Sequence, residues 1–243
     1  MSPQRVPVVG ILYPGHSAED DYPRAERMLG GSVSLPVVHT TVGVDTHEIE
    51  ALIDTGSPER LREGAARLAP AGPDAAMWAC TSGSFVYGLE GARRQAAAVA
   101  GQLGVPVSST SLAFAAAVHE LGVARVAIGA TYPNDLAALF QSFLGDAGIS
   151  VVAMGTLGIM EASEGGTLTR EHVLDLALAN RHPAAQAILL PDTALHTMAW
   201  LADLQQVVGV PVLTANQVTI WQGLRLVGHP AGRLDPMRAF GLA

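Results

Sequence analysis

Two stretches of sequence decide the fold of this chain, because in each of them a short apolar run stops at a reactive residue. The first is Met77-Trp78-Ala79-Cys80-Thr81-Ser82-Gly83-Ser84, and the second is Ile188-Leu189-Leu190-Pro191-Asp192-Thr193-Ala194-Leu195. Each is followed by a near-copy of one phrase, Leu103-Gly104-Val105-Pro106-Val107 and Val208-Gly209-Val210-Pro211-Val212. The repetition predicts a duplicated α/β unit with one reactive side chain in each half.

Short, β-branched apolar runs alternate with helix-like stretches along the chain. Such runs are typical of parallel strands covered on both faces, and the alternation indicates right-handed βαβ crossovers. We expect strands at 6–13, 34–42, 75–79, 105–108, 125–130, 150–154, 185–190 and 210–214, and helices at 59–68, 89–103, 134–147 and 170–179.

The pattern restarts near Arg125, where a second apolar run ends in Tyr-Pro as the first one does at Tyr13-Pro14. We therefore predict an α/β fold of two pseudo-symmetric lobes, each a short parallel sheet flanked by helices. Residues 1–113 and 217–243 are assigned to the first lobe, and residues 114–216 to the second. Open α/β sheets bind ligands beyond the carboxyl ends of their strands, so we expect the active site in the cleft between the lobes.

Composition excludes several classes of function. The 243 residues are 49% hydrophobic, enough for a sizeable core, and the net charge of −8 without a basic cluster argues against nucleic-acid binding. No apolar run is long enough to span a bilayer, the N-terminus lacks a signal-peptide pattern, and the single Cys fits a reducing compartment. We expect a cytoplasmic protein without a membrane partner, and oligomeric state is open, with a homo-oligomer as one option.

The absence of Lys from the sequence excludes a Schiff base with pyridoxal phosphate and a Walker A phosphate site. No group of Cys and His has zinc-site spacing. We therefore expect neither a cofactor nor a metal ion.

Cys80 and Asp192 each allow a structural and a catalytic interpretation. A lone Cys is commonly a buried structural thiol, but the polar residues after Cys80 and an expected helix start favour a reactive one. Asp192 before an expected helix makes a good N-cap, with Thr193 as another candidate, whereas its place as the counterpart of Cys80 favours catalysis. Sequence pattern alone leaves these two roles of Asp192 equally supported.

Four motifs together resemble the arylmalonate decarboxylase and maleate isomerase family, within the aspartate/glutamate/hydantoin racemase superfamily. They are Gly10-Ile11-Leu12-Tyr13-Pro14, Cys80-Thr81-Ser82-Gly83-Ser84-Phe85, Ala130-Thr131-Tyr132-Pro133-Asn134-Asp135 and Ile188-Leu189-Leu190-Pro191-Asp192-Thr193. The resemblance implies two lobes, an active site between them and no cofactor. It places Cys80 at the catalytic position of the first lobe, and it implies that Thr81, Ser82 and Tyr132 hold a substrate carboxylate. We also expect substrate contacts from Tyr13, Pro14, Thr193 and Ala194.

The chain departs from the family pattern at Asp192, where a second-lobe Cys is usual. The leading hypothesis is a cofactor-independent isomerase of a small carboxylic acid, similar to maleate cis-trans isomerase or to a racemase, with Cys80 and Asp192 on opposite faces of the substrate. The second is an arylmalonate-type decarboxylase that acts through an enediolate. The third is a module that binds a small anion without turnover.

Overall fold

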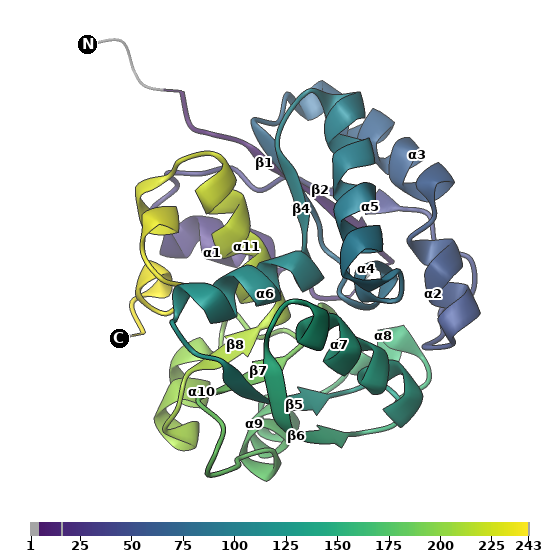
Figure 1. Ribbon diagram of the computed structural model, residues 1–243. Coiled ribbons are helices and arrows are strands. Elements are labelled where there is room, and N and C mark those ends of the chain that lie inside the picture. The colour runs from purple at the N-terminus through teal and green to yellow at the C-terminus, as the bar shows by residue number, and fades with distance from the viewer. Residues whose placement is uncertain (1–4, 16, 243) are drawn as a thin grey trace.

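The computed structural model describes residues 5–15 and 17–242, which form two parallel four-stranded sheets, one in each lobe (Figure 1). The first sheet has the order β2-β1-β3-β4, and the second has the order β6-β5-β7-β8. The strands are β1 Val9–Pro14, β2 Val37–Thr40, β3 Ala75–Trp78, β4 Val107–Ser109, β5 Arg125–Ala130, β6 Ser150–Thr156, β7 Ala187–Leu190 and β8 Val212–Thr214. The predicted α/β fold with two similar lobes is confirmed.

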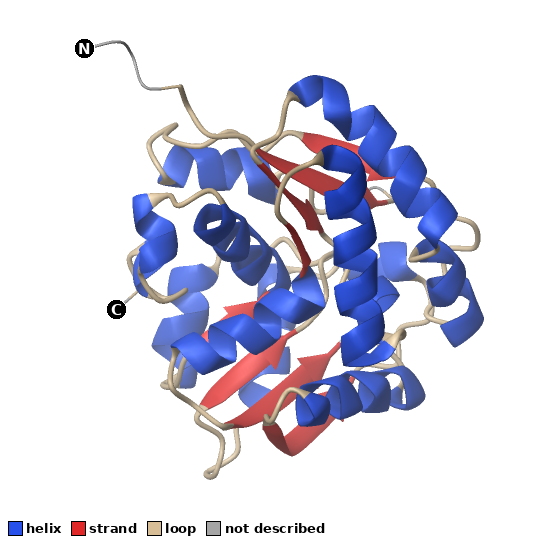
Figure 2. Cartoon of the chain, turned by 45° about the horizontal axis from the view of Figure 1, so that its top comes forward, coloured by secondary structure: helices blue, strands red, loops and turns tan. Residues whose placement is uncertain are grey.

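Helices cover the sheets and fill the space between them (Figure 2). They are α1 Asp21–Met28, α2 Ile49–Thr55, α3 Pro58–Leu68, α4 Ser82–Phe85, α5 Gly88–Leu103, α6 Thr110–Glu120, α7 Asn134–Asp146, α8 Ala162–Gly165, α9 Arg170–Ala179, α10 Leu201–Val208 and α11 Ala215–Leu226. The described residues also form three short 3₁₀ helices, at Ala69–Ala71, Pro230–Arg233 and Arg238–Phe240.

The identical strand order makes β3 and β7 equivalent, since each lies between the first strand and the last strand of its lobe. Every residue of both strands is buried, which explains their continuous apolar sequences. Cys80 follows β3, and Asp192 follows β7, so the two reactive residues occupy corresponding places in the two lobes.

Several strands start later than the sequence pattern indicates, and proline accounts for two of them. The runs expected from 105 and 210 begin as strands only at Val107 and Val212, each directly after a proline. Proline has no N–H to donate to the ladder and is therefore confined to the start or the edge of a strand.

The region between the lobes is apolar core rather than linker. Helices α6 and α11, which follow the last strands of the two sheets, pack against each other, and α11 also contacts β3, β4 and β8. Phe85 of α4 in the first lobe and Phe140 of α7 in the second lobe have ring centroids 5.2 Å apart. The predicted boundaries between the lobes, at residues 113 and 217, stay a prediction, because helices α6 and α11 pack against elements of both lobes.

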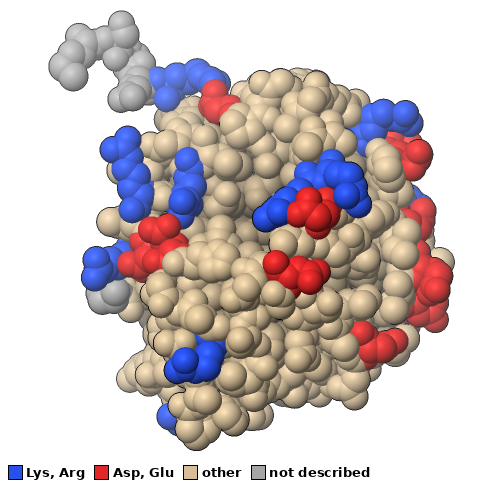
Figure 3. Space-filling model, viewed as in Figure 1, with Lys and Arg blue, Asp and Glu red and all other residues tan. Residues whose placement is uncertain are grey.

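The surface carries dispersed charge. On the face shown in Figure 3, several basic side chains lie directly beside acidic ones. Ion pairs between partly exposed side chains include Arg93–Glu90 and Arg225–Glu120. Within residues 5–15 and 17–242, no helix has both the length and the apolar character needed to cross a membrane.

Candidate active site

A cavity of about 310 Å³ lies between the two lobes and receives residues from both. Of the residues predicted from the sequence, those that line it are Tyr13, Pro14, Cys80, Ser82, Asp192, Thr193 and Ala194. The structure thus places the thiol and the carboxylate on one cavity. Thr81 and Tyr132 are not among its lining residues.

Cys80 is held by the start of α4. Its Sγ accepts a hydrogen bond from the Gly83 N–H at 3.2 Å, and the Ser82 hydroxyl lies 3.8 Å from the same sulfur. Burial, with a smaller contribution from the negative charge of Asp192, raises the pKa of the thiol to about 11. The contacts with Gly83 and Ser82 act in the opposite direction, and burial prevails. At neutral pH Cys80 is therefore a thiol, which is a proton donor.

Asp192 is buried and is fixed by two hydrogen bonds. Its Oδ1 accepts from the Ala194 N–H at 2.9 Å, and its Oδ2 accepts from the Thr131 hydroxyl at 2.5 Å. The helix expected to start at Thr193 does not form, because α10 begins only at Leu201. The N-cap interpretation of Asp192 and Thr193 is therefore wrong, since the bond to Ala194 closes a local turn in place of a helix cap.

Tyr13 joins the two lobes behind the cavity. Its hydroxyl donates to the Thr193 carbonyl at 2.9 Å and accepts from the Ala18 N–H at 3.1 Å. Burial raises the pKa of Tyr13 strongly, so the phenol stays neutral and keeps its proton for this bond.

Thr81 and Tyr132 are buried beside the cavity. The Tyr132 hydroxyl donates to the Pro191 carbonyl, and burial raises its pKa well above the usual value. The Thr81 hydroxyl is buried and has no hydrogen-bond partner among the described residues. It lies near enough to the Tyr132 hydroxyl to lower that pKa slightly, but the geometry between them is not that of a hydrogen bond. Their predicted contacts with substrate stay predictions.

Two loops that the sequence did not single out complete the site. The loop after β2 contributes Asp45 and His47, and the segment around α8 contributes Ser163. They bind each other across the lobes: the Ser163 N–H donates to Asp45 at 3.1 Å, and the His47 N–H donates to the Met160 carbonyl at 2.7 Å. Their sequences carry no strand-end motif that would have marked them.

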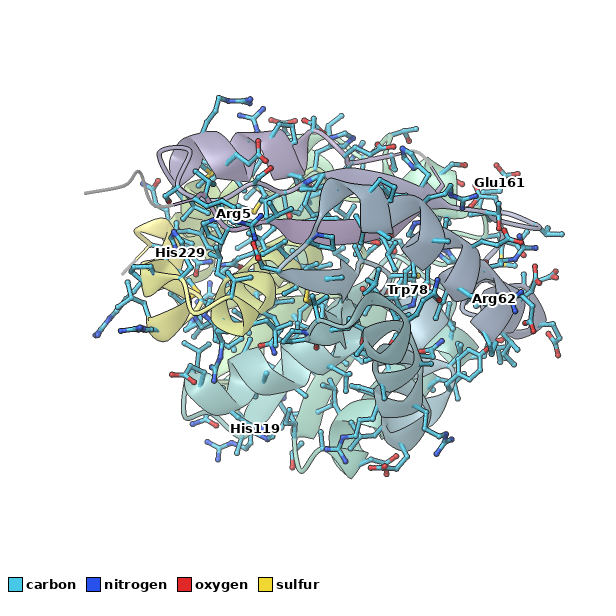
Figure 4. The ribbon with its side chains drawn as sticks, turned by 90° about the horizontal axis from the view of Figure 1, so that it is seen from above. Arg5, Arg62, Trp78, His119, Glu161 and His229 are labelled. Carbon is cyan, nitrogen blue, oxygen red and sulfur yellow. The ribbon has the colours of Figure 1, made fainter. Side chains whose placement is uncertain are left out.

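Glycine allows α8 to approach the Asp192 carboxylate. A Cβ atom added to Gly165 would lie 2.8 Å from the Asp192 Oδ2, closer than normal van der Waals contact. Figure 4 labels Glu161, just before α8, at the edge of the molecule, whereas Trp78 at the end of β3 lies in the interior. The site therefore lies between a buried strand end and a peripheral loop.

The charge of the cavity is negative. Asp45 and Asp192 line it, and no Arg among the described residues does. Within the same described residues, no group of three or more His, Cys, Asp or Glu side chains is arranged to hold a metal ion.

These features define a class: a two-lobed α/β protein with a reactive residue from each lobe on a shared cavity. The model of the arylmalonate decarboxylase family matches residues 40–236, and the chain belongs to this family.

Individual relatives agree with the assignment. The chain is 26% identical over 175 residues to the arylmalonate decarboxylase of Bordetella bronchiseptica, covering 71% of this chain and 73% of that protein. A solved arylmalonate decarboxylase variant, with one Gly changed to Cys and one Cys changed to Ser, is 24% identical at a TM-score of 0.80, covering 92% of this chain and 94% of its own. The maleate cis-trans isomerase of Nocardia farcinica, solved as a Cys-to-Ser variant with a covalent succinylcysteine intermediate, is 21% identical at a TM-score of 0.84, covering 93% and 94%. The fold is shared with both.

Proposed function

We propose that the protein is a cofactor-independent isomerase of a small carboxylic acid, in which Cys80 and Asp192 act on the substrate from opposite lobes. The observation that carries this proposal is their placement after the equivalent strands β3 and β7, on one cavity. Paired groups on two faces of a substrate can remove a proton from one side and return it on the other.

The contacts of the two residues suggest their roles. Asp192 accepts two hydrogen bonds, as a carboxylate does, and serves as the base that takes a proton from the substrate carbon. Cys80 carries the proton at neutral pH and delivers it to the opposite face of the resulting carbanion. The C–H bond broken on one face is replaced by a C–H bond on the other, so configuration inverts and no atom is lost. In the reverse direction the two residues exchange roles.

The substrate carboxylate requires donors rather than a positive charge, since no Arg lines the cavity among the described residues. We propose that Ser82 and Thr81 supply them. The Thr81 hydroxyl is buried without a partner, and a group of that kind costs about 1–3 kcal/mol unless something bonds to it. A carboxylate that develops enolate character would accept such a bond most strongly in the transition state.

Addition of a thiolate to a double bond is the route suggested by the covalent succinylcysteine of the Nocardia farcinica enzyme. In this chain a pKa of about 11 leaves only about one thiol in ten thousand ionised at pH 7. Proton transfer uses the prevailing form of Cys80, so racemisation or epimerisation is favoured over cis-trans isomerisation by thiolate addition.

Decarboxylation is the second candidate, on the strength of the family. An ionised Asp192 disfavours a malonate dianion, because two like charges 4 Å apart repel by about 4 kcal/mol at an effective dielectric near 20. Only this reaction releases carbon dioxide, and that product distinguishes it.

Proton NMR in deuterium oxide tests the proposal on a panel of candidate substrates. The panel contains monocarboxylates with a stereogenic carbon next to the carboxylate, maleate, and aryl- or alkylmalonates. We expect deuterium to enter at the carbon next to the carboxylate, and Cys80→Ser and Asp192→Asn each to slow this exchange at least a hundredfold. Asp203→Asn is the matched control, because Asp203 lies in the second lobe in an ion pair with Arg170 away from the cavity. Exchange that survives both active-site substitutions would overturn the proposal.

The remaining expectations stay proposals: a small carboxylate as the partner and a cytoplasmic location, with the oligomeric state open and a homo-oligomer as one option.

A further inference from the structure

The loop that carries Asp192 has no regular structure between β7 and α10. Its backbone polar groups are bound largely by side chains of the first lobe. The Tyr13 hydroxyl donates to the Thr193 carbonyl at 2.9 Å, and the Ser17 hydroxyl donates to the Ala194 carbonyl at 3.1 Å. Side chains of the first lobe therefore fix this loop together with its own local turn at Asp192 and Ala194.

Asp21, on α1 of the first lobe, binds the far end of this loop. It is fully buried, and its carboxylate accepts from the Thr197 N–H at 3.0 Å and from the Met198 N–H at 3.2 Å. A buried carboxylate is tolerated where several donors satisfy it. Here two of those donors are backbone groups of the loop that follows Asp192.

Asn216 completes the contact. Its Nδ2 donates to Asp21 at 2.9 Å and lies 3.2 Å from both the Thr193 and the Leu195 carbonyl oxygens. One side chain thus joins the Asp21 carboxylate to the backbone directly after Asp192. Displacement of Asp21 would release both ends of the loop.

We propose that Asp21 is a positioning residue that, with Asn216, holds the 192–198 loop across the lobes and so sets the direction of the Asp192 carboxylate. The proposal rests on the proposed function for its kinetic part, and on the loop contacts alone for its structural part. Asp21 does not line the cavity and has no part in the proton transfer itself.

The ionisation of Asp21 is expected to control this contact. Burial raises its pKa from 3.8 to about 6, with Asp20 adding to the rise, while the donors from Asn216, Met198 and Thr197 oppose it. Above pH 6 the carboxylate accepts every donor that faces it. Below pH 6 it gains an O–H among N–H donors, and one of the bonds to the loop is lost.

Other ionisable groups near Asp21 have to be separated from it. Tyr13 and Tyr22 feel its charge, but burial keeps both phenols neutral. The charge of Glu19 also acts on both phenols, and Asp20 pairs with His196, whose Nδ1 lies 2.6 Å from the Asp20 carboxylate. Asp20 is largely exposed and binds only that side chain, so Asp20→Asn is the matched control.

The test combines amide exchange with kinetics on Asp21→Asn and Asp20→Asn. In Asp21→Asn the new amide N–H₂ faces other donors, so the amides of Thr197 and Met198 are expected to exchange at least tenfold faster. We expect kcat to fall at least tenfold with KM changed less than threefold. In the unmodified protein we expect kcat to decrease as pH falls through 6, and this acid limb of the pH profile should disappear in Asp21→Asn. Asp20→Asn is expected to keep the amide protection and to keep the limb, moved slightly to lower pH because the Asp20 charge adds to the raised pKa of Asp21.

Two further measurements keep the test decisive. The first measurement needs no variant and serves if Asp21→Asn does not fold: in the unmodified protein, the Thr197 and Met198 amides should lose protection from exchange as pH falls through 6, after correction for the intrinsic exchange rate. The second uses Asn216→Ser, in which the same amides should lose protection at every pH. Unchanged protection in these measurements, or an acid limb of kcat that stays near pH 6 in Asp21→Asn, would overturn the proposal. If no acid is turned over, the proposed function fails, while the exchange measurements still decide the role of Asp21.

Discussion

Among single residues, the Cys80 thiol is one whose ionisation is opposed by its burial. Burial raises its pKa to about 11, and the Asp192 charge adds to the rise. We expect the rate of iodoacetamide alkylation, followed by mass spectrometry, to climb about tenfold per unit between pH 7 and 10 without a plateau, because only the thiolate reacts. Asp192→Asn should raise the rate at each pH, since it removes the negative charge. A plateau above pH 8.5 in the unmodified protein would contradict this prediction.

The sequence pattern predicted corresponding positions for Cys80 and Asp192 because both follow an apolar strand at the same place in a repeat, and both line one cavity. It could not identify Thr131, which donates to Asp192, because that contact brings together residues from separate strands. It also assigned substrate contacts to Tyr132, whose hydroxyl donates to the Pro191 carbonyl. A Tyr-Pro strand end marks a position near the cleft, but only the packing decides what the hydroxyl bonds to.

Among the elements, the four-residue helix α8 approaches the Asp192 carboxylate closely at Gly165. Gly165→Ala would place a Cβ 2.8 Å from the Asp192 Oδ2, and the end of that side chain must move. We expect turnover to fall at least tenfold while the melting temperature changes by only a few degrees, since a helix accepts Ala more readily than Gly and the crowded atom is the end of the Asp192 side chain. Gly145→Ala is the control, because a Cβ there meets nothing within 4 Å. Equal activity of the two variants would show that Asp192 has freedom to move.

Strands were predicted more accurately than the loop after β7. Continuous apolar runs such as 125–130 have one stable arrangement, the buried parallel strand, and this strand has the bounds expected. The Asp192-Thr193 pair equally fits a helix start, and the helix instead begins at Leu201. Backbone groups of this loop bond to distant side chains instead of to a helix. The Thr193 carbonyl, for example, accepts from Tyr13, about 180 residues away in sequence, and no local pattern reveals such a partner.

In the whole molecule, the two lobes share one apolar core and close on buried polar contacts. The core cluster includes Val9 of β1 and Val126 of β5, together with Trp221 of α11. Opening the lobes would expose this core as well as Asp21, so we infer that the lobes unfold together. The position of Asp192 then depends on the closed arrangement of the whole chain.

The burial of Asp21 between the lobes makes the stability of the whole molecule depend on pH. Its pKa is about 6 in the folded protein and 3.8 without the fold, so the folded state binds more protons between these values. Stability from this group is therefore greatest below pH 3.8, decreases as pH rises to 6, and then stays constant. Asn does not titrate, and any fixed effect of the substitution is the same at every pH. The unfolding free energy of Asp21→Asn minus that of the unmodified protein should thus increase by up to roughly 3 kcal/mol from pH 4 to pH 7.5, measured by urea denaturation. A difference that does not change with pH would show that Asp21 ionises as easily in the fold as outside it, and that its bonds to Thr197 and Met198 offset its burial completely.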